Sequence, residues 1–263
     1  MKCNSTLIKY RKLQESKAST VAGMKKFADI SKHVDINSVA EQMKALKVWT
    51  MDVINGTDIE FNLFDFIKAG LLVKFSLVMM GPPMMGKTPV SQMMAAYVAR
   101  GMQERANDNE SYYIQTGTVE GLSKVAGLLA DNVPILFDDL TPNSNRKGRT
   151  PLTPESLKHI FNVQSSEVVD ARYADIAVPE KCARLITTNA LTPHAWMPEI
   201  PHGLQTMAPS IRIQTCSGDA LAILKRCAFV LVENSFITSA KREAYWQEAQ
   251  NQASAKMARV LPP

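Results

Sequence analysis

The chain lacks the long apolar run that a membrane span requires. The nearest candidate, residues 61–80, is interrupted by Asp65, Lys68 and Lys74, whereas a bilayer span needs about 20 consecutive apolar residues. The amino terminus also lacks the apolar stretch and small-residue cleavage site of a secretory signal. Only 12 Gly and 14 Pro occur among 263 residues, too few for a collagen-like or low-complexity chain. We therefore expect a soluble, intracellular globular protein of one large domain or two modest ones.

Cysteine and histidine are scarce, and neither is arranged in a disulfide or metal-binding pattern. The four cysteines include no C-x-x-C pair, and the four histidines show no metal-ligand spacing. A disulfide framework and a structural zinc site are therefore not expected. Reduced, core-filling thiols fit a reducing compartment. The residues concerned are Cys3, Cys182, Cys216, Cys227, His33, His159, His194 and His202.

Positive charge is concentrated near the amino terminus. Residues 1–47 hold ten Lys/Arg and four Asp/Glu, a net charge of +6, whereas the remaining 216 residues carry 20 basic and 21 acidic groups. Two interpretations stay open: a solvated helical surface, or an arm that binds a polyanion such as nucleic acid or anionic lipid.

Three regions are expected along the chain. Apolar residues at helical spacing predict a helix over 18–30, and Ser38–Glu41 reads as a capping box that starts a second helix. Asn55-Gly56 is a turn signal and a plausible domain edge. The regions are 1–60, a basic helical region for oligomerisation or nucleic-acid contact; 61–235, the main domain; and 236–263, a C-terminal helix with a narrow apolar stripe.

The main domain alternates apolar strands with amphipathic helices. This alternation predicts an α/β fold, with a mostly parallel sheet covered by helices on both faces. Thr153-Pro154-Glu155 has an N-cap, a first-turn proline and an early acid, so a helix is expected to begin there. The other predicted strands are 75–80, 112–116, 133–137, 184–188 and 227–232, and the other predicted helices are 87–104, 119–130 and 220–226.

A phosphate-binding motif follows the first of these strands. Residues 81–88 fit G-x-x-x-x-G-K-[ST], in which loop N–H groups and a helix N-terminus direct positive partial charge at phosphates. Lys87 is predicted to reach the β- and γ-phosphates, and the Thr88 hydroxyl to ligate Mg²⁺. The motif comprises Gly81, Pro82, Pro83, Met84, Met85, Gly86, Lys87 and Thr88.

Met84 stands where such loops often carry glycine. A non-glycine residue there must avoid positive φ or accept strain. We therefore expect a less open loop and slower turnover than the motif alone would indicate.

An acidic pair ends the apolar strand about 50 residues later. If this strand lies beside the phosphate-loop strand, Asp138 and Asp139 come close to Thr88. Asp138 can then hold Mg²⁺ through water, and Asp139 can orient or deprotonate an attacking water. The alternative is a solvated acidic turn, which the preceding motif makes less attractive.

Two further polar residues are candidates for the same site. Asn189 ends the strand 184–188 and could hydrogen-bond a γ-phosphate or the attacking water. Arg226 ends a predicted helix, and an arginine directed at a neighbour's γ-phosphate would stabilise transition-state charge. It could equally be a cation that complements the helix dipole, and the sequence does not separate these readings.

Together, these elements resemble superfamily 3 helicases over roughly residues 75–235. The segment 186–196, with its terminal asparagine and Pro-x-x-Trp, is similar to replication initiator proteins of circular single-stranded DNA viruses. Residues 172–181 resemble the hairpin that contacts DNA in the ring channel, and 220–232 resemble the arginine-finger helix and its following strand. Unlike those initiators, the chain has no H-x-H motif, so DNA nicking is not expected.

The resemblance implies an AAA+-like phosphate-loop ATPase with a five-stranded sheet, which binds ATP and Mg²⁺ between the subunits of a homo-oligomeric, usually hexameric, ring. It implies a helicase in DNA replication, acting on single-stranded DNA in preference to RNA, in the host nucleus or cytoplasm if the protein is viral. The implied roles are phosphate and metal binding for Lys87 and Thr88, magnesium and water for Asp138 and Asp139, a sensor for Asn189, a trans-acting finger for Arg226, and nucleic-acid contact for Arg172, Tyr173 and Lys181.

Other functions remain in competition. The chain could be an AAA+-like remodelling or assembly ATPase with a protein substrate, or a module that binds nucleotide without turnover. A more distant likeness to the picornavirus replication ATPase would imply RNA and membranes instead. A second basic cluster, Arg146, Lys147 and Arg149, is an additional candidate for nucleic-acid contact.

Overall fold

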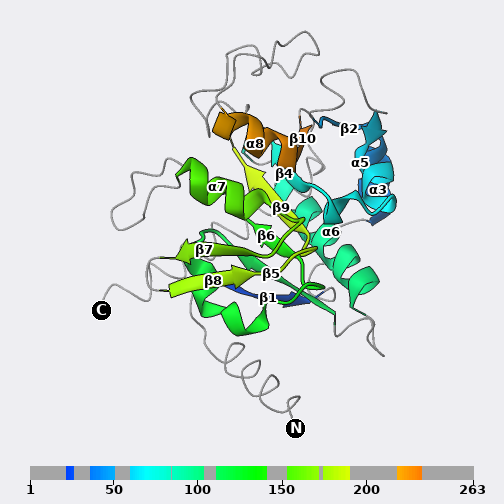
Figure 1. Ribbon diagram of the computed structural model, residues 1–263. Helices are drawn as coiled ribbons and strands as arrows, with labels where there is room; N and C mark the ends of the chain where they lie inside the picture. The colour runs from blue at the N-terminus through cyan, green and yellow to red at the C-terminus, as the bar shows by residue number, and fades with distance from the viewer. Residues whose placement is uncertain are drawn as a thin grey trace, which may run out of the picture.

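The sheet at the centre of the protein has six strands, five of them parallel (Figure 1). The computed structural model describes residues 22–26, 36–50, 60–83, 85–103, 111–140, 153–171, 174–189 and 218–232. The spatial order is β1-β5-β6-β9-β4-β10, with only β1 antiparallel to its neighbour. The strands are β1 (Ala22–Lys26), β4 (Ser76–Met80), β5 (Tyr112–Thr116), β6 (Ile135–Phe137), β9 (Arg184–Thr188) and β10 (Cys227–Leu231).

The parallel strands are buried on both faces, which explains their nearly continuous apolar sequences. All five residues of β4 and all five of β9 are buried. Successive side chains point to opposite faces of a strand, so Tyr113, Leu136 and Leu185 join one apolar cluster while their sequence neighbours join the other. The sheet therefore separates two cores.

Helices cover each face of the sheet. The core containing Tyr113 and Leu136 also contains residues of α6 (Lys87–Met102), α3 (Ile36–Ala45) and α5 (Leu63–Lys68). On the other side lie α7 (Pro154–Phe161), α8 (Gly218–Arg226) and the antiparallel hairpin of β7 (Glu167–Ala171) and β8 (Ala174–Val178), as Figure 1 shows. The predicted mostly parallel α/β sheet with helices on its faces is confirmed.

The amino-terminal region differs from the prediction in two places. Residues 22–26 form a strand rather than a helix. Gly23 weakens a helix, and pairing with β5 satisfies the backbone of this segment, so a sixth strand joins the expected five. The helix predicted at Ser38–Glu41 begins two residues earlier, at Ile36, and ends at Ala45. The predicted capping box at Ser38–Glu41 is therefore wrong.

The segment after Ala45 is extended. It contains β2 (Lys47–Val48), which pairs with β3 (Phe61–Asn62). Trp49 then forms a bridge with Phe229 of β10, with mutual backbone hydrogen bonds of 2.8 Å. These contacts attach the amino-terminal helices to the edge of the sheet that carries β10.

Most element boundaries in the main domain are predicted well, with one exception. The strands 112–116 and 184–188 are confirmed, and α7 begins at Pro154 with the Thr153 hydroxyl accepting from the Ser156 N–H. The predicted helix over 119–130 is instead two 3₁₀ turns, η3 (Glu120–Lys124) and η4 (Ala126–Leu128). Each contains a glycine, which disfavours a continuous α-helix.

A further 3₁₀ turn, η1 (Leu71–Val73), precedes β4. Of the helices within the described ranges, none combines the length and apolar character that crossing a bilayer would need. The predicted turn at Asn55-Gly56, the basic cluster Arg146, Lys147 and Arg149, and the C-terminal helix over 236–263 lie outside the described residues.

Candidate functional site

The loop between β4 and α6 requires glycine at both ends of its motif. Gly81 has φ +154°, and a Cβ there would lie 2.5 Å from the carbonyl oxygen of Val232. Gly86 has φ +82° and immediately precedes α6, a left-handed conformation that glycine adopts without steric cost. The chain can therefore turn tightly out of the sheet and start a helix at once. Pro82 and Pro83 are exposed on this loop, Met85 is half-buried, and Met84 lies outside the described residues.

Lys87 lies beneath this loop and is held by three oxygen acceptors. Only 6% of the residue is exposed. Its Nζ donates to the carbonyl oxygens of Gly81 at 2.8 Å and Pro82 at 2.5 Å, and to Asn189 Oδ1 at 3.1 Å. Burial lowers the pKa of Lys87, while the charges of Asp139 and Asp138 oppose this shift. A phosphate oxygen could replace these neutral acceptors, because charge-assisted hydrogen bonds are stronger than neutral ones.

The Asp138 carboxylate receives hydrogen bonds from three different elements. Its Oδ1 accepts from Thr88 Oγ1 of α6 at 2.6 Å and from Thr187 Oγ1 of β9 at 2.9 Å. Its Oδ2 accepts from Gln115 Nε2 of β5 at 3.1 Å. The expected proximity of Thr88 and Asp138 is confirmed. The expected strand adjacency is wrong, because β9 lies between β6 and β4.

Asn189 connects Lys87 with the second carboxylate of the pair. Its Nδ2 donates to Asp139 Oδ1 at 2.9 Å while its Oδ1 accepts from Lys87. Asp139 has φ +56°, a conformation in which aspartate is enriched among non-glycine residues, and its N–H donates to Thr187 Oγ1 at 2.9 Å. Both Asp139 and Asn189 are exposed, so their side chains face outward from the edge of the sheet.

Thr187, Gln115 and Gln92 belong to this constellation, although the sequence analysis missed them. Thr187 is 2% exposed and links the two aspartates, since its hydroxyl donates to one and accepts from the backbone of the other. The sequence did contain a signal for Thr187, because it is a polar residue near the end of an apolar strand. Thr187 lies two residues after Leu185 and therefore shares the face of the sheet that packs against α6.

The structure places Arg226 far from this constellation. Cys227, the next residue, pairs with Ser76 at the start of β4, so Arg226 lies at the amino edge of the sheet while Lys87 follows the carboxyl edge. Five residues of strand span about 16 Å. The Arg226 guanidinium donates to the Ala222 carbonyl at 2.7 Å, which is the helix-end contact expected from the simpler of the two interpretations.

Of the three predicted nucleic-acid residues, only Lys181 belongs to the part of the chain that the structure describes. Arg172 and Tyr173 connect β7 to β8 but lie outside the described residues. Lys181 follows the strand β8, which ends at Val178. It is exposed, with φ +55°, and its ammonium lies 3.6 Å from Glu180. Lys181 therefore sits at the base of the hairpin.

The donor set fits a magnesium-bound nucleotide better than a metal held by protein alone. Among the described residues, no group of three or more His, Cys, Asp or Glu side chains could hold a metal ion. Mg²⁺ is usually bound through one or two protein groups together with substrate phosphates. The Thr88 hydroxyl and the Asp138 carboxylate, 2.6 Å apart, could provide such a pair beside the loop between β4 and α6.

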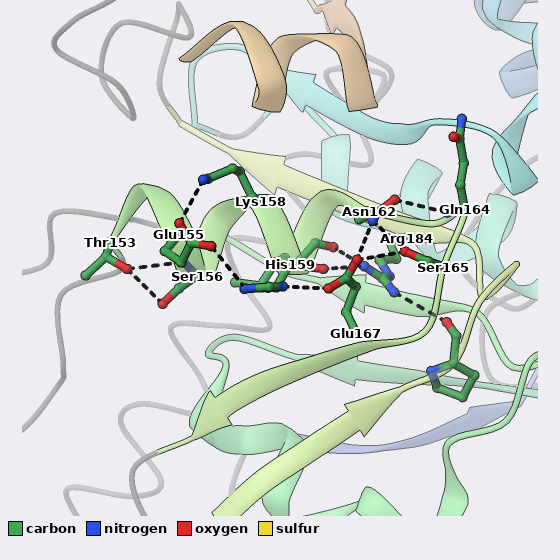
Figure 2. Close-up of polar contacts among 12 residues, drawn as sticks. Thr153, Glu155, Ser156, Lys158, His159, Asn162, Gln164, Ser165, Glu167 and Arg184 are labelled. Atoms are coloured by element: carbon green, nitrogen blue, oxygen red, sulfur yellow. Dashed lines mark hydrogen bonds and ion pairs between the residues drawn. The ribbon is translucent and has the colours of Figure 1, made fainter. Parts of the chain in front are cut away.

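A second polar network lies at the amino edge of the sheet (Figure 2). Arg184, the first residue of β9, is fully buried, and its Nη1 donates to the carbonyl oxygens of His159 at 2.6 Å and Ile160 at 2.7 Å. Its Nη2 donates to Pro179 at 3.3 Å. Burial lowers the pKa of Arg184 to about 10. Because the two acceptors of Nη1 are carbonyls in the last turn of α7, this cation caps a helix.

Glu167 joins the same network from β7. Its carboxylate accepts hydrogen bonds from Asn162 Nδ2 and, at 2.8 Å, from Ser165 Oγ, and lies 2.6 Å from His159 Nδ1. Burial acts to raise the pKa of Glu167, but the bonds from His159, Ser165 and Asn162 outweigh it, so the pKa lies below its usual value. This network attaches the hairpin to α7 (Figure 2).

Comparisons with known proteins leave the family open. No protein-family model matches the chain, and no curated protein and no solved structure matches it either.

Proposed function

We propose that the protein is a magnesium-dependent ATPase that drives movement along nucleic acid, in the manner of superfamily 3 helicases. The observation that carries this proposal is the arrangement of Lys87, Thr88, Asp138, Asp139 and Asn189. These residues are far apart in the sequence, yet hydrogen bonds of 2.6–3.1 Å join them at one edge of the sheet. Their types match the parts that phosphoryl transfer requires.

The strand order supports an AAA+-like core. The strand that ends in Asn189, β9, lies between the phosphate-loop strand β4 and the acid-bearing strand β6. A residue at the end of β9 is therefore between the triphosphate-binding loop and the aspartates, where a sensor of the γ-phosphate would act. This position supports the proposed role of Asn189 as the sensor.

Each residue has a defined task in the proposed reaction. The N–H groups at the start of α6 and the Lys87 ammonium bind the triphosphate and stabilise the charge that develops on its oxygens. Asp139, exposed at the site and oriented by Asn189, accepts a proton from the attacking water. Thr88 and Asp138 would hold Mg²⁺, which would neutralise part of the phosphate charge.

A ring assembly would explain the position of Arg226. Because this residue lies at the opposite edge of the sheet from Lys87, it can act on a nucleotide only in a neighbouring subunit. In that case, ATP binding would stabilise the assembly, and Arg226 would leave its contact with the Ala222 carbonyl to reach the partner's γ-phosphate. Arg172, Tyr173 and Lys181 remain proposed contacts to the nucleic acid.

The proposal is tested by ATP turnover with and without single-stranded DNA or RNA, alongside sizing with and without nucleotide. We expect Mg²⁺-dependent turnover that single strands stimulate, and assembly promoted by ATP. Mixing Arg226→Ala with Lys87→Ala subunits should recover part of the activity that each lacks alone, since each supplies the part missing from the other. Turnover that nucleic acid leaves unchanged would favour a protein-remodelling ATPase, and no turnover at all would overturn the proposal.

A further inference from the structure

Gln115 is a polar residue of the buried strand β5, and both ends of its side-chain amide form hydrogen bonds. Its Nε2 donates to Asp138 Oδ2 at 3.1 Å, and its Oε1 accepts from Gln92 Nε2 at 2.9 Å. The two glutamines are half-buried. Because Gln92 donates to the oxygen of the Gln115 amide, the nitrogen end of that amide is the end directed at the carboxylate.

The backbone places Gln115 and Asp138 on the same face of the sheet. Gln115 pairs with Leu136 in the parallel register of β5 and β6, and the Asp138 N–H donates to the Thr116 carbonyl at 2.7 Å, which continues the pairing beyond the end of β6. Residues two apart in a strand share a face. Asp138 therefore points, as Leu136 does, toward α6.

Helix α6 holds both oxygens of the carboxylate. Thr88 and Gln92 are four residues apart and lie on the same side of this helix. Thr88 contacts Asp138 Oδ1 directly, and Gln92 acts on Oδ2 through Gln115. The carboxylate is fixed at two points against rotation about its Cβ–Cγ bond, which a single hydrogen bond would not achieve.

The remaining acceptor capacity of Asp138 lies on Oδ2. Each carboxylate oxygen can accept about two hydrogen bonds. Oδ1 accepts two, from Thr88 and Thr187, whereas among the described residues Oδ2 accepts only one, from Gln115. The direction in which Gln115 turns Oδ2 therefore sets where this carboxylate can receive a metal-bound water.

We propose that Gln115, oriented by Gln92, is a positioning residue that sets the affinity of the site for the metal of a bound magnesium nucleotide. The inference rests on the proposed nucleotide site and adds a specific role for the strand β5. Outer residues that orient metal-binding groups typically change metal affinity by about 10- to 100-fold when they are replaced. Gln115 acts through Asp138, so replacing Gln115 should weaken metal binding more than nucleotide binding.

The test measures Mn²⁺ binding by electron paramagnetic resonance, in protein saturated with a non-hydrolysable ATP analogue. Gln115→Leu keeps a similar side-chain size and removes the amide. We expect about a tenfold loss of Mn²⁺ affinity and a matching rise in the Mg²⁺ concentration that half-saturates turnover. Affinity for a fluorescent ATP analogue in the presence of EDTA should stay within about twofold, because the nucleotide contacts remain.

Two further variants separate positioning from simple packing. Gln92→Leu should weaken Mn²⁺ binding less than Gln115→Leu does, and the double variant should be no worse than Gln115→Leu, because Gln92 acts through Gln115. Gln164→Leu is the matched control, since Gln164 is exposed at the amino edge, where it donates to the Lys74 carbonyl. Its Mn²⁺ affinity should equal that of the wild type.

The outcomes distinguish this inference from the function on which it rests. Wild-type Mn²⁺ affinity in the folded Gln115→Leu variant would overturn the positioning role and leave the nucleotide site intact. Equal losses of Mn²⁺ binding and of metal-free nucleotide binding would also overturn it, because they would indicate a structural role. A wild-type protein that binds the analogue neither with nor without metal would overturn both proposals.

Discussion

Lys87 and Arg184 are both cations buried against the same sheet, one at its carboxyl edge and the other at its amino edge. Arg184 donates to carbonyls at the end of α7, which would lose their partners if the guanidinium moved. Lys87 donates to carbonyls of its own loop and to exposed Asn189, and two aspartates lie nearby. The partners of a buried cation, rather than its burial, therefore indicate whether it completes the fold or can exchange its contacts for a ligand.

The largest effect on stability is expected at the amino edge. Arg184→Met removes a fully buried guanidinium and leaves the helix-end carbonyls of His159 and Ile160 without their donor. We expect a loss of about 3 kcal/mol in the free energy of unfolding, measured by urea denaturation. Lys68→Met, exposed in the last turn of α5, is the control and should change it by less than about 0.5 kcal/mol. A similar small change for Arg184→Met would contradict the assignment of a structural role.

The corresponding change at the carboxyl edge should affect activity more than stability. Lys87→Ala removes the cation from the phosphate loop, and ATP turnover should fall at least ~100-fold, about 2.7 kcal/mol in activation free energy. The free energy of unfolding should change by less than about 1 kcal/mol, because two of the three acceptors of Lys87 belong to the exposed residues Pro82 and Asn189. Lys124→Ala, exposed on η3, should keep wild-type turnover. Unchanged turnover in Lys87→Ala would contradict a catalytic site at the carboxyl edge of the sheet.

A smaller effect, dependent on pH, is expected at Glu167. Its pKa is lower in the folded protein than its usual value, so its carboxylate contributes stability above about pH 4.5, which is lost as the pH falls through the folded pKa. Glu167→Gln should cost about 1 kcal/mol at pH 7 and should lose less stability than the wild type on acidification from pH 5 to 3. Unfolding curves across this range test the prediction. The same slope for the wild type and the variant would contradict it, and Glu41→Gln, exposed on α3, is the control.

Sequence reasoning located the strand ends well because apolar runs and the residues that interrupt them are local features. The phosphate-loop motif, Asp138 and Asn189 were all identified from such runs, and the predicted closeness of Thr88 and Asp138 follows from the common edge of parallel strands. The spatial order of the strands, in contrast, depends on contacts between residues that are far apart in the sequence. The sequence could not indicate that β9 would lie between β4 and β6, since any of several orders satisfies the same connections.

Residues whose role depends on a partner in another element were missed for the same reason. Gln115 is a plain polar residue in a strand until Gln92 and Asp138 are brought beside it. Arg184 reads in the sequence as the charged start of an apolar strand, and only the packing of α7 buries it. The helical spacing of apolar residues over 18–30 predicts a helix, whereas residues 22–26 form a strand because their backbone pairs with β5.

Isothermal titration calorimetry of ATP binding to the purified protein, in the presence and absence of Mg²⁺, tests the proposed nucleotide site most directly. We expect one Mg·ATP bound for each chain, weaker binding when the metal is removed, and at least tenfold weaker binding in Lys87→Ala. Absence of binding to the wild type, or equal affinity for Mg·ATP in the wild type and Lys87→Ala, would contradict a nucleotide site at the carboxyl edge of the sheet.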